Sequence, residues 1–222
     1  MNMSTAIGAS EPLVTPLADG SVLRLGGLLP VDGRLSWAPS DSRGFQPVNC
    51  YLVIAPDRTI MIDTGVAAHE REVMTGLAQA MPKDRPFSLF LTRSEYECIG
   101  NLGPISETYQ LQFLMTGGLN NPFDAFDDVS RAHDLWDNRQ RLGLIEVGEW
   151  ARFGLSRRLF GLGAPIKILN SYWAYDKQTD TCFCSDFFPS IMQSADQSLI
   201  IDAVPGKAEI AEARRQLLAK FY

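Results

Sequence analysis

Residues 49–65 read NCYLVIAPDRTIMIDTG, and this stretch decides the fold. Asn49–Ile54 and Thr59–Asp63 are apolar runs with β-branched and aromatic residues, a composition typical of buried strands. The residues between them, 55–58, include a proline and an aspartate and predict a tight turn. The stretch therefore predicts a strand pair that ends in an Asp-Thr-Gly turn.

The elements on either side of this stretch predict a layered α/β or α+β domain. Apolar residues recur at helical spacing up to about Met81, and a hairpin is predicted to turn at 31–34 and return at 35–37. Further strands are expected at 22–29, 87–92, 111–115, 144–147, 166–169, 171–176 and 181–185, and helices at 129–142 and 207–220. Residues 1–20 are predicted to be a loose leader, and residues 21–222 a single domain.

The charge balance argues against nucleic acid as a partner. The net charge is −6, whereas a protein that binds a phosphate backbone usually carries a basic stripe. Arg152, Arg157 and Arg158 form the densest basic cluster, and we interpret them as a solvated face.

Targeting signals and cysteine usage indicate a cytoplasmic protein. No apolar run reaches the length of about 18 residues that a membrane span needs, and the first ten residues lack the features of a secretory signal. Membrane association is therefore not expected. The four cysteines are expected to be reduced thiols, because a chain of this size does not depend on disulfides.

Residues 91–101 read LTRSEYECIGN. Together with the hairpin and its Asp-Thr-Gly turn, they resemble the metallo-β-lactamase-fold superfamily. The similarity is greatest to the branch of flavodiiron and oxygen-binding di-iron proteins, whose motif is His-x-Glu-x-Asp-His-x-Gly-Asn. Glu95 matches the motif's glutamate and Glu97 stands at its aspartate, but Arg93 and Cys98 stand at its two histidines.

A second block, residues 172–188, resembles the strand of that branch that carries a metal-bridging aspartate, which would be Asp186. The histidine expected before Tyr172 is missing, and no histidine follows Asp186. His69 and His133 fall outside every matching ligand position, and we expect His69 to face solvent at a helix start. The resemblance implies a four-layer αββα sandwich, shortened at its C-terminus, with a degenerate metal site.

The same resemblance selects the candidate site residues, and none of them is assigned a catalytic role. Metal ligands that remain available are Glu95, Glu97, Cys98 and Asp186, with Asp63 behind them as a supporting carboxylate. Candidates for contact with a bound molecule are Arg93, Tyr172, Trp173 and Tyr175. Because a guanidinium only donates hydrogen bonds and stays protonated, Arg93 is interpreted as a replacement for the metal charge.

Three functions stay open at this point, and so does the question of whether the chain is an enzyme. The first is a metal-free binding or regulatory protein, or one repurposed catalytically. The second is an oxidoreductase or oxygen sensor that holds iron, or zinc, through the carboxylates and the thiolate. The third is a metal-independent enzyme that acts on a small anionic molecule held by Arg93. No cofactor is expected under the first reading, and an exposed sheet edge would allow a homodimer.

Overall fold

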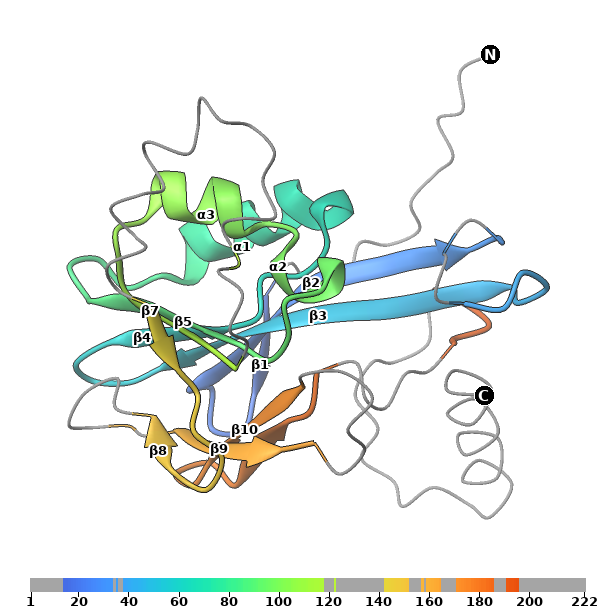
Figure 1. The fold of residues 1–222 in the computed structure, drawn as a ribbon. Coiled ribbons are helices and arrows are strands. Elements are labelled where there is room, and N and C mark those ends of the chain that lie inside the picture. Colours follow the sequence, from blue (N-terminus) through green and yellow to red (C-terminus); the bar gives the residue numbers. More distant parts are fainter. Residues whose placement is uncertain are drawn as a thin grey trace.

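The structure is a computed structural model that describes residues 14–33, 35, 38–117, 122, 142–151, 157, 159–164, 171–185 and 191–195. This part of the chain forms two sheets, with helices on one side of the larger sheet (Figure 1). The larger sheet has the strand order β1 (Thr15–Leu17), β2 (Val22–Val31), β3 (Gly44–Ile54), β4 (Thr59–Ile62), β5 (Phe87–Leu91), β6 (Leu111–Thr116) and β7 (Leu142–Leu144). The smaller sheet has the order β11 (Thr181–Phe183), β10 (Tyr172–Asp176), β9 (Leu159–Gly163) and β8 (Trp150–Ala151).

The larger sheet changes from antiparallel to parallel pairing at β4. Strands β1 to β4 pair antiparallel, whereas β5, β6 and β7 continue the sheet in parallel. Every residue of β4 and β5 is buried. Parallel strands of this kind read as continuous apolar runs because both of their faces are covered.

Two cores cover those two faces. Side chains alternate along a strand, so Met61 packs on the helix side with Val73 and Leu77, while Ile60 and Ile62 pack toward the smaller sheet. The helix side holds a 3-10 turn (Ala67–His69), α1 (Glu70–Ala80), α2 (Tyr96–Ile99) and α3 (Leu102–Thr108). The described residues thus form three layers, helices, sheet and sheet, and confirm the predicted α/β class. Three predicted elements lie outside the described residues. They are the outer helix at 207–220, the strand at 166–169 and the helix at 129–142, of which only the last residue is described.

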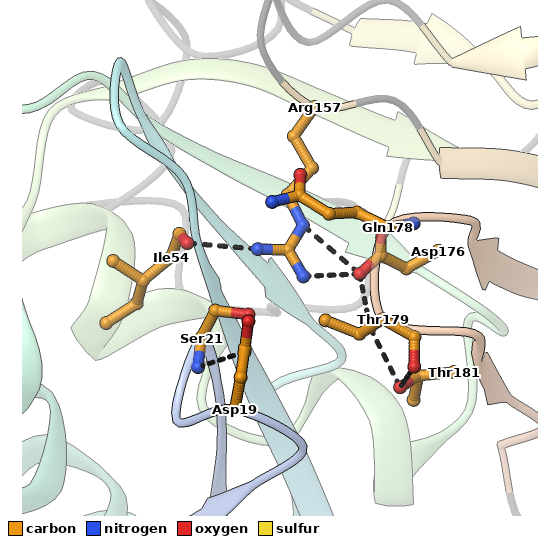
Figure 2. Close-up of polar contacts among 8 residues, drawn as sticks. All are labelled: Asp19, Ser21, Ile54, Arg157, Asp176, Gln178, Thr179 and Thr181. Atoms are coloured by element: carbon orange, nitrogen blue, oxygen red, sulfur yellow. Dashed lines mark hydrogen bonds and ion pairs between the residues drawn. The ribbon is translucent and has the colours of Figure 1, made fainter.

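A buried arginine joins the two sheets (Figure 2). The guanidinium of Arg157 donates to the main-chain oxygen of Ile54 at 3.1 Å and, through Nε, to the Asp176 carboxylate at 3.1 Å. Its Nη2 also donates to Asp176, and Thr179 Oγ1 donates to the same carboxylate oxygen at 2.5 Å. Burial alone would raise the pKa of Asp176, but the hydrogen bonds from Arg157 and Thr179 outweigh it and lower the pKa.

Four sequence predictions are corrected by the structure. Arg157 is buried and ion-paired, not solvated, while Arg152 and Arg158 lie outside the described residues. His69 is buried and not solvent-facing, because it packs over Gly27.

The third correction concerns the leader and the fourth the first hairpin. The leader does not extend to residue 20, since Thr15–Leu17 pairs with β2 and Arg24 donates to Thr15 Oγ1 at 2.9 Å. The strand that pairs antiparallel with the end of β2 is β3, where Gly44 lies opposite Val31; of the predicted return at 35–37 only Leu35 is described, and it lies outside a strand. No helix in the described parts of the chain is both long and apolar enough to cross a lipid bilayer.

Candidate functional site

The candidate site lies where β4 and β5 end. Asp63 follows β4 with a φ of 55°, a left-handed conformation that aspartate tolerates better than most residues. Its carboxylate accepts hydrogen bonds from the main-chain nitrogen of Thr92 at 2.7 Å and from Thr92 Oγ1 at 2.6 Å. Asp63 therefore ties the two strand ends together, and both of its carboxylate oxygens are engaged in doing so.

A second set of bonds fixes α2 against the Asp-Thr-Gly turn. The main-chain nitrogen and the hydroxyl of Thr64 donate to the carbonyl of Cys98 at 2.6 and 2.9 Å. Asn101 Nδ2 donates to the carbonyls of Thr64 and Val66 at 2.7 and 3.0 Å. A Cβ at Gly100 would lie 2.5 Å from a backbone nitrogen, so this close approach requires glycine. These contacts explain why the Ile-Gly-Asn end of the motif is present without the histidines.

The charged residues of the motif separate into an inner pair and an outer rim. Arg93 Nη1 lies 3.4 Å from Glu97 Oε1, and their side chains are 10% and 19% exposed. Glu95 is exposed, and Tyr96 at the start of α2 is 80% exposed. The structure thus brings Arg93 together with Glu97 and places Glu95 on the outside.

Cys98 is buried at the inner end of the site. Its Sγ lies 3.6 Å from Thr92 Oγ1 and 3.4 Å from Ser185 Oγ, which lies two residues beyond the end of β11. Burial, followed by the negative charge of Asp63, raises the pKa of the Cys98 thiol well above its usual value. The environment favours the neutral thiol over the thiolate that a metal would require.

The three aromatic candidates do not share one face. Tyr172 and Ala174 face the core between the sheets, and the Tyr172 ring occupies the space beside Gly117. By the alternation of a strand, Trp173 and Tyr175 lie on the opposite face, where the Tyr175 hydroxyl donates to Asp180 at 2.7 Å. Tyr172 reaches the site through its main-chain nitrogen, which donates to the carbonyl of Thr92 at 2.9 Å.

Three residues that help to build the site were not predicted from the sequence. Thr92, Asn101 and Ser185 all place a hydroxyl or amide against it. Thr92 and Asn101 frame the motif, so their position was a usable signal. Ser185 is 87 residues from Cys98, and no local pattern links the two. Asp186 lies outside the described residues.

Among the residues that are described, no three His, Cys, Asp or Glu side chains gather as a two-metal centre would need. The donors are also of the wrong chemistry. One is a protonated guanidinium, one a buried neutral thiol, and the Asp63 carboxylate is used by Thr92. The described residues therefore do not fit a two-metal centre.

Comparison with known proteins identifies the fold. No family model matches the chain, and no curated protein matches it. Solved structures do match. A fragment of diflavin flavoprotein A 5 from Nostoc is 17% identical, with a TM-score of 0.62 over 93% of this chain and 75% of its own.

Two further structures are matched over a similar part of this chain. Rubredoxin oxygen:oxidoreductase from Desulfovibrio gigas is 16% identical with a TM-score of 0.66, covering 94% of this chain and 48% of its own. The Flv1 flavodiiron core from Synechocystis is 13% identical with a TM-score of 0.67, covering 92% and 48%. The chain spans about half the length of these two proteins. At these identities the similarity establishes the architecture: the chain has the metallo-β-lactamase-like fold of the flavodiiron proteins.

Proposed function

We propose that the chain is a metal-free binding or regulatory protein in which the Arg93–Glu97 pair takes the place of a metal centre. The observation that carries this proposal is the 3.4 Å contact between these two largely buried side chains, at positions that the di-iron resemblance assigns to metal ligands. A cation placed there would meet the fixed positive charge of the guanidinium.

The frame around the pair supports the same reading. Asp63, Thr64 and Asn101 hold the turn and α2 by hydrogen bonds to main-chain atoms and to Thr92. None of these bonds requires an ion. The loop that would carry metal ligands is therefore held in place by the protein alone, and it presents the exposed residues Glu95 and Tyr96 as a contact surface for a partner.

The iron-binding alternative is weakened by Cys98. A thiolate ligand would need Cys98 to lose its proton in a buried position beside Asp63. The anion-binding enzyme is less favoured because Glu97 already partly neutralises Arg93.

The homodimer, expected from exposed sheet edges, is part of the proposal and is checked by light scattering on the purified chain.

The test is the iron, manganese and zinc content of the chain after anaerobic reconstitution, together with its unfolding temperature with and without a chelator. We expect no metal that depends on Glu97 or Cys98, and no change of unfolding temperature on chelation. About one iron per chain, lost in Glu97→Gln and in Cys98→Ser but retained in Glu70→Gln, a change of an exposed residue on helix α1, would refute the proposal.

A further inference from the structure

Two thiols lie side by side on the smaller sheet, away from the Arg93–Glu97 site. Cys182 Sγ and Cys184 Sγ are 3.6 Å apart. Cys182 is exposed and Cys184 is partly exposed, so both are within reach of a solute. Nothing in the function proposed above uses them.

The strand explains why the thiols meet. Cys182 is paired with Tyr175 in the β10–β11 ladder, and Phe183 points into the core between the sheets. Neighbouring residues of a strand point to opposite faces, so Cys182 lies on the outer face. β11 ends at Phe183, and Ser185 has a φ of 57°, so the chain turns directly after Cys184. This turn allows the second thiol to lie over the first.

The spacing of the sulfurs matches a particular coordination geometry. With zinc–sulfur bonds of about 2.3 Å, a sulfur separation of 3.6 Å corresponds to a sulfur–zinc–sulfur angle of about 103°, close to tetrahedral. A linear two-coordinate ion would need the sulfurs more than 4 Å apart, at roughly twice the metal–sulfur bond length. The pair is thus already arranged for a tetrahedral ion.

We propose that Cys182 and Cys184 form a dithiolate site for a tetrahedral thiophilic divalent ion of the zinc(II) class. Formation of the two metal–sulfur bonds displaces one proton from each thiol, so binding one Zn²⁺ releases two protons. The two thiolates occupy two of the four positions. Within the described residues no further His, Cys, Asp or Glu side chain completes the group, so water or a small-molecule ligand would fill the other two positions.

The experiment is a titration of the full chain, reduced and kept under anaerobic conditions, with Co²⁺ as an optical probe and then with Zn²⁺ as competitor. We expect about one ion per chain, a sulfur-to-cobalt charge-transfer band, and the intense visible absorption of a tetrahedral site. Cys182→Ser and Cys184→Ser should each weaken Zn²⁺ binding by roughly tenfold or more, because even supporting residues around a metal cost that much.

The matched control is Cys98→Ser, which removes a buried thiol of the first site and should leave the titration unchanged. Pale octahedral cobalt without the charge-transfer band would overturn the inference, and so would serine variants that bind Zn²⁺ as tightly as the original chain. An ion lost in Cys98→Ser but kept in Cys182→Ser would lie at the first site. That result would refute the proposed function as well, so the two failures are distinguishable.

Discussion

Replacing Arg157 with methionine should destabilise the fold severely. The guanidinium donates two hydrogen bonds to Asp176 and one to Ile54, and both charged side chains are 1% exposed. Removing one partner of such a pair strands a buried charge and costs about 3–5 kcal/mol. A typical domain is stable by about 5–15 kcal/mol, so the loss is a large fraction of the total. For a chain of this size, a loss of about 4 kcal/mol lowers the unfolding temperature by about 8–16 °C.

Urea unfolding followed by circular dichroism measures this loss, with an unchanged slope against denaturant if both states keep their compactness. The double variant Arg157→Met/Asp176→Asn is the control, because it removes the stranded charge and keeps an acceptor for Thr179. It should recover most of the lost stability. A single variant that costs less than about 1 kcal/mol, or a double variant as unstable as the single one, would show that the pair does not hold the sheets together.

The same pair sets a pH dependence. The pKa of Asp176 is lower in the folded chain than its usual value of 3.8. The contribution of the Asp176 carboxylate to the free energy of unfolding is therefore complete above about pH 4 and is lost as the pH falls through the lower folded pKa. The acid loss should shrink in Asp176→Asn, as measured by urea unfolding at a series of pH values.

Three further predictions concern single positions. Gly100→Ala places a Cβ 2.5 and 2.7 Å from backbone atoms and should cost about 1–3 kcal/mol in thermal unfolding, whereas Gly163→Ala, with its nearest neighbours 3.6 Å away, should not. Thr92→Val removes one donor from the buried Asp63 carboxylate and should cost about 1–3 kcal/mol in urea unfolding, while Thr92→Ser should preserve stability to within about 1 kcal/mol; equal losses would contradict the role given to the hydroxyl. Burial lowers the pKa of His69 below 6.5, so the contribution of the neutral imidazole to the free energy of unfolding is complete above that value and is lost as the pH falls through the folded pKa. This loss should be absent in His69→Gln when the free energy of unfolding is measured at a series of pH values.

The central strands could be predicted because their own residues carry the signal. Residues 59–62 and 87–91 are buried on both faces, and a continuous apolar run is the pattern that such strands show. The predicted turn at Asp32-Gly33 is also where β2 ends. The strand that pairs with β2 could not be predicted from the neighbouring residues, because it begins thirteen residues beyond the end of β2, at Gly44.

The polar contacts of the interior were less predictable, since their partners are distant in sequence. Arg157 reads as one of three surface arginines, and its burial follows from an aspartate 19 residues away and a carbonyl 103 residues away. His69 begins a helix, where exposure is the ordinary expectation, yet the glycine at 27 leaves room for the imidazole over β2. In both cases tertiary packing overrides the local pattern.

The frame of the candidate site has a consequence for how the chain can change. The bonds that hold α2 in place run between Thr64, Asn101 and main-chain carbonyls, and the charged residues at 93, 95 and 97 contribute none of those bonds. Of the three, Glu95 is exposed, so substitution there can alter what the loop recognises while its scaffold persists. A protein built in this way can change its contact surface at the exposed position 95 while the hydrogen bonds beneath it stay in place.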